Sequence, residues 1–354
     1  MKKKVFLFLQ DGVGGAERMT VLIGKSLDRR FYDVTFVTVP NGKVVSKIES
    51  FIPNNYSIIK LEKKNPLILM IKILFLLKKK KPDIVFSSTF FLSSKILPFK
   101  KIFKKIHFII RCENYLFTFS RKQKLLIKCT YPLADSIIAQ TSEMELEMRS
   151  FLKSRFNIIK TLENPIDTQM ISEKLVEASN PFLGEKNKII VASGRFSFQK
   201  GFDLLIRAFA KLYEKEKNIK LVIIGSKEGP HENYYNQVWN LIEKYQLTNN
   251  VQCLGFQQNP YLFIRYADCF VLSSRWEGLP NVLIESLYLG TPVAAFKCIP
   301  IIERIVKDGI NGYLAEKEDV ESLSEAIRMS MLLGRIKSDY YGSKLSDFVT
   351  TQHP

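Results

Sequence analysis

The chain has 354 residues, of which 46% are hydrophobic and 25% are charged. This length and composition predict a globular protein of two domains, and they exclude a fibrous, collagen-like or largely disordered chain. The formal net charge is +18, from 53 basic minus 35 acidic residues. Residues 1–180 hold 32 basic and 16 acidic side chains, a net +16, so the first half carries nearly all of the excess charge.

The cysteines and the apolar runs indicate the cellular compartment in which the protein is expected. Five cysteines are scattered with no Cys-x-x-Cys pair and no His at metal-ligand spacing, a usage typical of a reducing cytosol. The run Val5–Leu9 is too short for a signal-peptide core and is predicted to be a first strand. The longest apolar stretch, Pro66–Leu77, contains Lys72 and falls far short of the roughly 20 residues that span a bilayer. We therefore expect no transmembrane helix.

Short runs rich in Val, Ile and Phe alternate with longer helical stretches, the pattern of parallel sheets built from strand–helix–strand units. The predicted strands of the first half are Lys4–Leu9, Val34–Val39, Tyr56–Leu61, Asp83–Ser88, His107–Cys112, Ser136–Ala139 and Asn157–Thr161. Those of the second half are Lys188–Ser193, Lys220–Gly225, Val251–Phe256, Cys269–Ser274, Val293–Phe296 and Gly312–Leu314. The clearest helices are Gly201–Lys217, Asn233–Gln246 and Val282–Leu289. We expect two doubly wound α/β domains, 1–165 and 186–335, with a linker at 166–185 and a tail at 336–354.

Ligands of open parallel sheets bind beyond the carboxyl ends of the strands, so the loops there are the candidate sites. The first such loop, DGVGGAER (Asp11–Arg18), follows the first strand and opens a helix. Its glycines let backbone N–H groups approach an anion. Glu17 stands where a dinucleotide-binding G-x-G-x-x-G motif has its third glycine, so that motif is excluded. A glycine-rich turn without a ligand is the structural alternative.

A second loop, SGRFSFQKG (Ser193–Gly201), places Arg195 and Lys200 between a strand and a helix. Two cations beside a helix N-terminus suit a diphosphate, because Arg supplies a planar fork and Lys a mobile point charge. Chance placement on the surface of a basic protein is the alternative.

A third loop, SSRWEGLPNVLIES (Ser273–Ser286), is the most informative stretch of the chain. Its glycine and proline shape the turn after a strand, and Asn281 is predicted to be the N-cap of the helix that follows. The helix N-terminus suits a phosphate. Glu277 and Glu285, eight positions apart, suit the hydroxyls of a sugar; solvated acids on a loop and a helix are the alternative.

The fourth loop, RCENYLF (Arg111–Phe117), follows the fifth predicted strand and places Arg111, Glu113 and Asn114 at the mouth of the first domain. A carboxylate there suits a hydrogen bond to a sugar. An exposed acid at the end of a strand is a common structural feature and is the alternative.

Together these segments resemble the retaining glycosyltransferases of family 4. The matching motifs are Gly14–Arg18, Gly194–Gly201, the NPID sequence at Asn164–Asp167, and E-x7-E at Glu277–Glu285, in order over nearly the whole chain. The resemblance implies the GT-B fold, in which two Rossmann-like doubly wound parallel-sheet domains face each other across a cleft. It also implies a nucleotide-diphosphate sugar donor held mainly by the second domain, with a UDP-sugar favoured over a GDP-sugar, and an acceptor met by the first.

Carried over to this chain, the resemblance assigns roles to particular residues. Arg195 and Lys200 would bind the donor diphosphate and stabilise the charge of the leaving group, so that no metal or other cofactor is required. Glu277 would hold hydroxyls of the transferred sugar. Further donor contacts are expected from Gly14, Gly15, Gly225, Ser226, Phe256, Asn259, Gly278, Leu279, Pro280, Asn281, Val282 and Glu285. Many members have His after the fifth strand, where this chain has Glu113, and we expect Glu113 to take the sugar contact.

The excess charge is concentrated between Lys60 and Lys105, where 13 lysines face Glu62 and Asp83, a net +11, among Leu, Ile and Phe. Such basic amphipathic segments lie on anionic membrane surfaces. The residues expected to do so are Lys63, Lys64, Lys72, Lys78, Lys79, Lys80, Lys81, Lys101, Lys104 and Lys105. Nucleic-acid binding is the competing use of such charge, but no recognition motif accompanies it, so no nucleic-acid partner is expected. A core-facing helix with solvated lysines remains the structural alternative.

The sequence thus favours a retaining glycosyltransferase that uses a hexosyl or N-acetylhexosaminyl donor. Its expected acceptor is a lipid-linked or envelope glycan of the lipopolysaccharide, O-antigen or capsule type. Its expected location is the cytoplasm, peripheral on the inner face of the membrane. Two alternatives stay open. One is a soluble GT-B enzyme such as an alpha-glucan synthase or a sugar-nucleotide epimerase, and the other is a non-catalytic basic binding protein.

Overall fold

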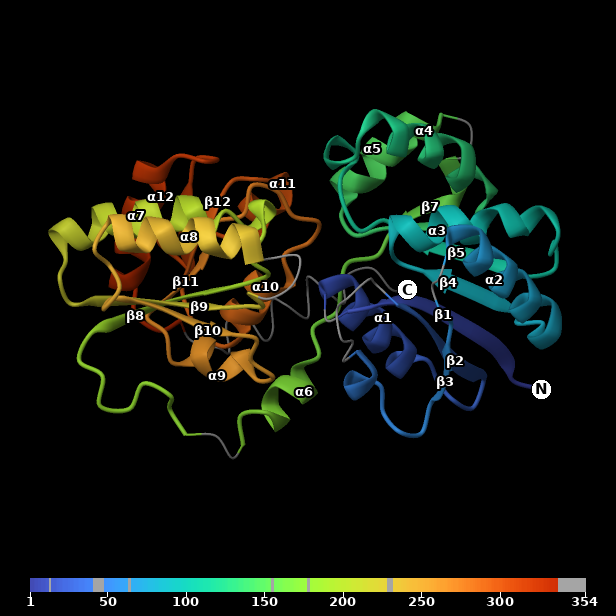
Figure 1. Ribbon diagram of the computed structural model, residues 1–354, viewed down its shortest axis with the longest axis horizontal. Coiled ribbons are helices and arrows are strands. Elements are labelled where there is room, and N and C mark those ends of the chain that lie inside the picture. Colours follow the sequence, from blue (N-terminus) through green and yellow to red (C-terminus); the bar gives the residue numbers. More distant parts are fainter. Residues whose placement is uncertain are drawn as a thin grey trace. The chain divides into compact units, whose positions relative to one another are not determined.

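The computed structural model describes residues 1–12, 14–40, 48–62, 65–153, 156–176, 179–227 and 232–336. The chain divides into two compact units, Met1–Asn164 and Pro165–Pro354 (Figure 1). The first predicted domain ends one residue beyond this division, and the predicted linker at 166–185 falls within the second unit. Of the predicted tail, residues 337–354 lie outside the described part of the chain.

The first unit is built on a parallel sheet of seven strands in the order β3-β2-β1-β4-β5-β6-β7. The strands are β1 (Lys3–Asp11), β2 (Tyr32–Pro40), β3 (Ser57–Lys60), β4 (Ile84–Ser87), β5 (His107–Arg111), β6 (Ser136–Ala139) and β7 (Ile159–Thr161). All seven predicted strands of this half are present. The seventh begins at Ile159 and not at the predicted Asn157, because residues 156–158 form a 3₁₀ turn.

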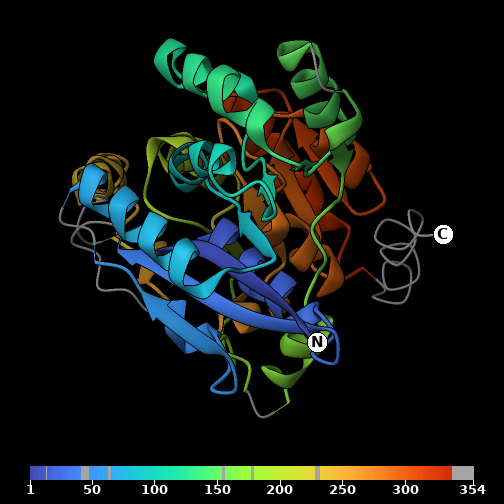
Figure 2. The same ribbon diagram turned by 90° about the vertical axis from the view of Figure 1, so that its right-hand side faces the viewer.

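Helices connect these strands. They are α1 (Gly15–Ser26), α2 (Pro66–Lys80), α3 (Phe90–Ile96), α4 (Arg121–Thr130) and α5 (Ser142–Leu152), with short 3₁₀ turns η1 (Ile48–Phe51), η2 (Leu97–Lys101), η3 (Leu116–Thr118), η4 (Tyr131–Leu133) and η5 (Phe156–Ile158). Figure 2 shows α2, in pale blue, packed over one face of this sheet and running roughly along its strands. Asn65 caps α2 by accepting the Leu67 N–H at 2.8 Å, and Pro66 is its first residue, a common helix start.

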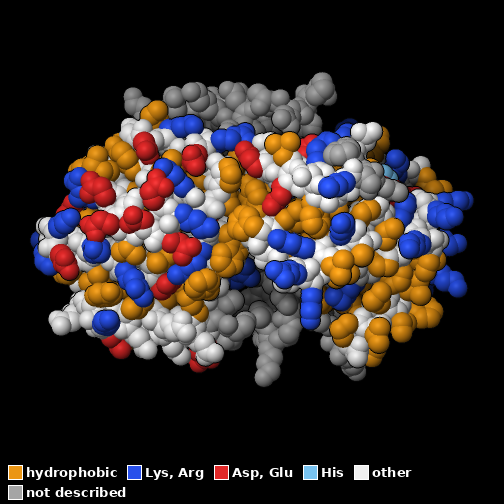
Figure 3. Space-filling model, turned by 90° about the horizontal axis from the view of Figure 1, so that it is seen from above, with side chains coloured by type: hydrophobic (Ala, Val, Ile, Leu, Met, Phe, Trp, Pro, Cys, Tyr) orange, Lys and Arg blue, Asp and Glu red, His pale blue; other side chains and the backbone are white. Residues whose placement is uncertain are grey.

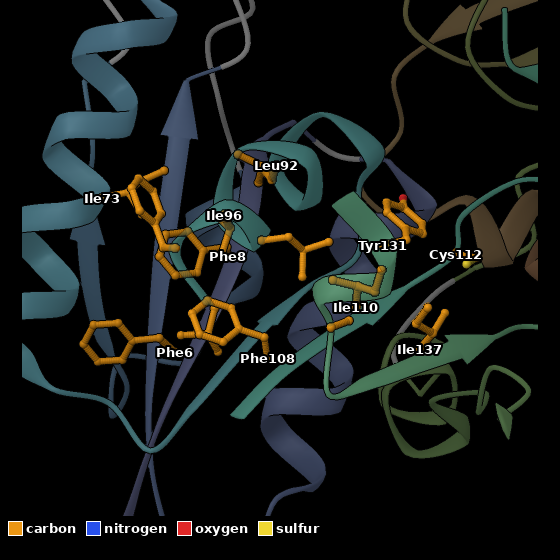
Figure 4. Packing of buried hydrophobic residues seen from close by; sticks show 14 of the residues in the cluster. Phe6, Phe8, Ile73, Leu92, Ile96, Phe108, Ile110, Cys112, Tyr131 and Ile137 are labelled. Atoms are coloured by element: carbon orange, nitrogen blue, oxygen red, sulfur yellow. The ribbon is translucent and has the colours of Figure 1, made fainter. Parts of the chain in front are cut away.

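The core of the first unit lies on both faces of its sheet. Because side chains alternate along a strand, Phe6 and Phe8 of β1 face one core while Leu7 and Leu9 face the other. The first core is closed by buried residues of α2, α3 and η4, and Figure 4 shows Phe8 packed against Ile73 and Ile96. Burial on both faces explains why β1 is a continuous apolar run and not an alternating one.

The second unit has a parallel sheet of six strands in the order β10-β9-β8-β11-β12-β13. The strands are β8 (Lys188–Ser193), β9 (Ile219–Ile224), β10 (Val251–Gly255), β11 (Cys269–Leu272), β12 (Val293–Phe296) and β13 (Gly312–Ala315). These are the six predicted strands, within two residues at each end. The central strands β8, β11 and β12 are buried along nearly their whole length, as in a sheet covered on both faces.

The helices of the second unit are α6 (Thr168–Glu173), α7 (Phe202–Lys215), α8 (Glu232–Lys244), α9 (Pro260–Arg265), α10 (Asn281–Tyr288), α11 (Pro300–Ile305) and α12 (Val320–Leu332), with the 3₁₀ turn η6 (Phe198–Lys200). The predicted helices at 201–217, 233–246 and 282–289 correspond to α7, α8 and α10. In α7 the residues Leu205, Ile206 and Phe209 are fully buried at helical spacing, so one face of this helix packs on the sheet.

Candidate active site

The order of strands in the second sheet marks a point where a ligand is expected. The order reverses between β8 and β11, which are hydrogen-bonded neighbours although β9 and β10 lie between them in the chain. Open parallel sheets bind ligands beyond the carboxyl ends of strands at such a point. The loops that follow these two strands are Gly194–Gly201 and Ser273–Pro280, which contain the predicted cations and Glu277. Two segments more than 70 residues apart in the chain therefore meet at one edge of the sheet.

An ion pair joins the two loops. The Lys200 Nζ lies 2.6 Å from the Oε1 of Glu277, and the same oxygen accepts a 2.6 Å hydrogen bond from the Ser274 hydroxyl. The side chains of Lys200 and Glu277 are only 16% and 9% exposed. Removal from water strengthens the attraction between two such charges relative to a surface pair. The structure thus brings together the predicted diphosphate-binding lysine and the predicted sugar-binding carboxylate.

Arg195, the second predicted cation of this loop, is placed differently. Its side chain is exposed, and no described residue accepts a hydrogen bond or forms an ion pair with it. Lys200 is therefore held in place by the protein, whereas Arg195 extends into solvent at the end of β8. Of the two, only Lys200 is preorganised in this structure.

Glycines allow the loops to approach so closely. A Cβ atom on Gly194 would lie 2.9 Å from the Lys200 Cε, so the stem of that lysine lies over this glycine. Gly201 has φ +62°, and a Cβ there would overlap the carbonyl of Ser273. At Gly225, which follows β9, a Cβ would overlap the backbone carbonyl of Gly194. The site is thus assembled by backbone contacts that only glycine permits.

The turn into α10 is tight and mostly buried. Gly278, Leu279 and Pro280 are all buried, and the Asn281 N–H donates to the Leu279 carbonyl at 2.9 Å. The prediction that Asn281 is the N-cap was wrong: the helix begins at Asn281, and its N-cap position is Pro280, which has no side chain that can accept a hydrogen bond. The proline ring, with its fixed backbone angle, sets this start. No side-chain cap covers the positive end of the helix, as an anion-binding terminus requires.

Glu285 and several other predicted donor contacts belong to the second unit as well. Glu285 is half-buried and accepts a 3.4 Å hydrogen bond from the Tyr261 hydroxyl. Gly225 and Ser226 follow β9, and the Gly225 N–H donates to the carbonyl of Gly255 at 2.9 Å. The remaining predicted donor contacts of these loops are Val282, which is half-buried, Phe256, which is exposed after β10, and Asn259, whose amide donates to the Lys174 carbonyl at 2.7 Å.

In the first unit the order of strands reverses between β1 and β4. Gly14 occupies the N-cap position of α1 and Gly15 its first turn, again with no side-chain cap. Glu113 follows β5, and its Oε1 accepts the Phe90 N–H at the start of α3 at 3.0 Å. The negative charge of Glu113 thus lies at a helix N-terminus, where it is stabilising, and its side chain is half-buried.

Arg111 is not at the mouth of the first domain, as the sequence suggested, but is 3% exposed. Its Nη2 donates to the Oδ1 of Asn164, and the amide of Asn164 in turn donates to Gln140 at 3.3 Å. Burial lowers the pKa of Arg111 to about 10, against the opposing attraction of Glu113. Arg111 and the asparagine of the NPID motif are therefore partners in a buried polar network, which binds Asn164, the last residue of this unit, to Arg111 and Gln140.

Two residues of the site in the second unit were not predicted from the sequence. The Ser274 hydroxyl donates to the Glu277 carboxylate, and Arg275 is buried. The available signal was a set of polar residues directly after an apolar strand, which marks a carboxyl-end position. That signal does not say which side chain turns inward.

Within the described ranges, His, Cys, Asp and Glu side chains form no group of three or more that could hold a metal ion. In the same part of the chain no helix combines the length and the apolar character needed to cross a membrane.

Two family models match the chain in succession. The model for Glycosyltransferase Family 4 matches residues 13–170, and the model for Glycosyl transferases group 1 matches residues 176–342. The chain belongs to glycosyltransferase family 4. This membership confirms the resemblance that the motifs at Gly14–Arg18, Gly194–Gly201 and Glu277–Glu285 indicated.

Known relatives of this family 4 glycosyltransferase include three bacterial and archaeal proteins. An uncharacterized glycosyltransferase of Methanocaldococcus jannaschii is 35% identical over 64% of this chain and 58% of its own length. The amylovoran biosynthesis glycosyltransferase of Erwinia amylovora is 23% identical over 94% of this chain and 92% of its own. The Campylobacter jejuni N-acetylgalactosamine-N,N'-diacetylbacillosaminyl-diphospho-undecaprenol 4-alpha-N-acetylgalactosaminyltransferase is 31% identical over 61% of this chain and 56% of its own.

The fold is also that of solved glycosyltransferases. Anabaena HepE, crystallised with UDP-glucose, superimposes with a TM-score of 0.78 over 98% of this chain and 99% of its own, at 18% identity. At this identity the likeness concerns the fold alone. It confirms the predicted GT-B class, with a Rossmann-like parallel sheet in each unit.

Proposed function

We propose that this glycosyltransferase is a retaining enzyme that moves a sugar from a nucleoside-diphosphate sugar to a lipid-linked or envelope-glycan acceptor. The observation that carries the donor assignment is the ion pair between Lys200 and Glu277 at the point where the strand order of the second sheet reverses. A cation for a diphosphate and a carboxylate for sugar hydroxyls lie there side by side, next to an uncapped helix N-terminus.

The donor would be held by charge complementarity. Lys200 and Arg195 would bind the diphosphate, and the positive end of α10 would add to the field that stabilises the leaving group. Glu277 would exchange its contact with Lys200 for hydroxyls of the transferred sugar, and Glu285 would hold the ribose. With two cations and a helix terminus neutralising the phosphates, the proposed reaction requires no metal.

The expected donor is a UDP-sugar in preference to a GDP-sugar, carrying a hexose or an N-acetylhexosamine. The HepE structure contains UDP-glucose, and its fold matches over nearly the whole chain, which supports this choice. Retention of the anomeric configuration would follow from attack on the same face as the departing diphosphate. No protein nucleophile is assigned.

The acceptor would meet the first unit. Glu113, half-buried at the start of α3, would contact a sugar hydroxyl, and Gly14 and Gly15 would offer uncapped backbone N–H groups to a phosphate. The Campylobacter relative is named for an acceptor built on diphospho-undecaprenol, and the Erwinia relative for amylovoran biosynthesis. These names support a lipid-linked precursor of an envelope glycan.

The donor assignment predicts selective stabilisation by nucleotides. The purified protein is expected to show a higher melting temperature with UDP or a UDP-sugar, unchanged by EDTA, because a ligand that binds only the native state stabilises it. At a nucleotide concentration of 100 Kd the stabilisation is about 2.7 kcal/mol. The screen compares UDP, GDP, ADP and their sugar conjugates. A shift with GDP alone would overturn the UDP assignment, and no shift with any nucleotide would favour a non-catalytic binding protein.

The product of the reaction and its anomeric configuration distinguish the proposed retaining transferase from the other enzymes considered. With the donor that stabilises the protein, the anomeric configuration of the product is read by proton NMR at early times. Retention in a glycoside supports the proposal. Inversion would contradict it, a polymer of glucose would indicate an alpha-glucan synthase, and conversion of the nucleotide sugar without transfer would indicate an epimerase.

The membrane surface is proposed from α2 and its surroundings. One side of α2 is buried at Leu69, Ile73 and Leu77, yet Leu67 and Phe75 on the other side are 70% and 64% exposed. A helix that is apolar all round is normally covered by another apolar phase. Figure 3 shows lysine and arginine side chains interleaved with hydrophobic ones over the first unit. An anionic bilayer is the partner that complements both properties.

The lysines of this surface are accessible. Those that the structure describes as exposed are Lys78, Lys79, Lys80, Lys81, Lys101, Lys104 and Lys105, whereas Lys72 is half-buried and pairs with Glu62 at 3.4 Å. The predicted contacts Lys63 and Lys64 lie outside the described residues. All five cysteines are free, as in a reducing compartment, which supports a location on the cytoplasmic face of the membrane.

Charge reversal tests this surface. Changing Lys78, Lys79 and Lys80 together to Glu is expected to weaken binding to phosphatidylglycerol vesicles at least about hundredfold, since each cation near the lipid contributes about 1 kcal/mol and the new carboxylates repel the anionic surface. Vesicle flotation at increasing salt provides the measurement. The matched control changes three exposed lysines of the second unit, Lys186, Lys188 and Lys244, to Glu. An equal loss in the control, or equal binding to phosphatidylcholine vesicles, would reject the α2 surface.

A further inference from the structure

Arg275 is a buried cation that the proposed donor site does not use. It lies two residues before Glu277 in the loop after β11 and is 6% exposed. A guanidinium is costly to bury unless its donors are matched, so its partners indicate its purpose. The partners come from the loop and helix that follow β8 and from residue 318, far along the chain.

The guanidinium donates four hydrogen bonds and lies against an aromatic ring. Its Nη1 and Nη2 donate to the two carboxylate oxygens of Asp203 at 2.9 and 2.7 Å, a bidentate pairing. Nη1 also donates to the Phe198 carbonyl at 2.8 Å, and Nε donates to Glu318 at 3.1 Å. The guanidinium carbon lies 3.8 Å from the centre of the Phe198 ring. Arg275 therefore binds the loop that contains Lys200, through the carbonyl and the ring of Phe198.

Backbone contacts extend the connection between the two loops. The Arg275 N–H donates to the Gln199 carbonyl at 2.8 Å, and the Gln199 side-chain amide donates to the Trp276 carbonyl at 3.0 Å. The residues directly before Lys200 are thus tied to the residues directly before Glu277. These contacts hold the two loops together and so fix the distance between the Lys200 Nζ and the Glu277 carboxylate.

The charges of the pair persist over a wide pH range. Burial alone would lower the pKa of Arg275, but the hydrogen bonds from its fork to Asp203 outweigh burial and raise that pKa. Burial likewise opposes ionisation of Asp203, yet hydrogen bonds from Arg275 and Tyr234 lower the pKa of this carboxyl. The contact therefore acts as a permanent structural tie and not as a pH switch.

We propose that Arg275 is a positioning residue for the donor site. Its planar fork holds the loop Phe198–Lys200 against the loop Arg275–Glu277, so that the Lys200 ammonium is presented beside the Glu277 carboxylate. Four of the five N–H donors of the guanidinium are engaged by Asp203, Glu318 and the Phe198 carbonyl, so Arg275 acts on a bound diphosphate only through Lys200, a step that rests on the proposed function. A lysine cannot replace it, because an ammonium has three N–H donors for the four hydrogen bonds that Arg275 makes and lacks the planar fork that pairs with both oxygens of Asp203.

The test measures the chemical reactivity of the Lys200 amine directly and needs no substrate. Trace acetylation with acetic anhydride, followed by peptide mass spectrometry, reports how freely each lysine reacts. Lys220, which pairs with Glu185 elsewhere in the same unit, serves as the internal control. In R275K and in the charge-neutral double variant R275Q/D203N, we expect Lys200 to react about tenfold faster while Lys220 is unchanged. The Kd for UDP, measured by calorimetry, is expected to rise by a similar factor.

The outcomes are distinct. Unchanged Lys200 reactivity in folded variants would overturn the proposal, and so would an equal rise at Lys220, since that would show a loss of overall stability. The exposed pair of Arg328 with Glu325 gives a matched substitution, R328K, which is expected to leave both lysines and UDP affinity unchanged. If the unaltered protein binds no nucleotide, the proposed function fails, but the labelling result still decides whether Arg275 positions Lys200.

Discussion

Replacing Lys200 by Ala is expected to lower turnover with the preferred donor on the order of 100- to 1,000-fold. The substitution removes the cation that is fixed beside Glu277 at the proposed diphosphate position, and it leaves the carboxylate of Glu277 buried with only the Ser274 hydroxyl as a described donor. The loss should appear mainly in kcat, because charge on the leaving group develops in the transition state. Initial rates of transfer, or of donor hydrolysis where the acceptor is absent, provide the measurement.

A matched lysine controls for charge and for folding. Lys211 also forms an ion pair, with Glu321, but it lies on the exposed side of α7, so K211A is expected to retain normal activity. Melting curves of both variants establish that they are folded. Turnover of K200A within threefold of the unaltered enzyme would remove Lys200 from the proposed catalytic role, whatever the behaviour of Arg195.

The Gly225→Ala substitution is expected to destabilise the second unit by about 3 kcal/mol or more. The added methyl group would overlap the Gly194 carbonyl, a backbone group that cannot rotate away as a flexible side chain does. Both tryptophans of the chain, Trp239 and Trp276, lie in the second unit, so urea unfolding followed by tryptophan fluorescence reports on this unit alone. The expected result is a lower urea midpoint with an unchanged slope.

Gly255 supplies the control for this prediction. It is the last residue of β10 in the same unit and has φ +72°, but a Cβ there meets nothing within 4 Å. Gly255→Ala should therefore cost only the strain of the left-handed backbone, about 1 kcal/mol. Equal destabilisation by the two variants would mean that close approach to the Gly194 carbonyl does not explain the glycine at 225.

The strands were the part of the structure best predicted from the sequence. Runs such as Lys188–Ser193 and Val293–Phe296 coincide with observed strands to the residue. They are short, rich in β-branched residues and bounded by polar or glycine-containing turns, so their signal is local. The start of α10 was misplaced by one residue because Asn is a good N-cap by type, while the fixed backbone angle of Pro280 determined where the turn ended.

The candidate residues of the second unit were also identified from local motifs. The sequence pointed to Lys200 and Glu277 because each lies in a glycine-containing loop after a predicted strand. That the two side chains meet depends on β8 and β11 being neighbours, which is a property of the strand order. The motif assigned Arg195 and Lys200 the same role, and only the folded chain distinguishes an exposed cation from a fixed one.

By itself, then, the sequence determined the class of fold, the two parallel sheets and the loops where chemistry is expected. Hydrophobic periodicity, turn residues and loop motifs each depend on a few neighbouring residues, so they can be recognised without the tertiary structure. The tertiary structure decided which side chains turn inward and what they touch. Arg111 ends an apolar strand and Arg275 follows one, so the two look alike in the sequence, yet one is bound to Asn164 of its own unit and the other to Asp203. Burial of a charge is settled by partners distant in the chain, and those partners come together only when the sheets have formed.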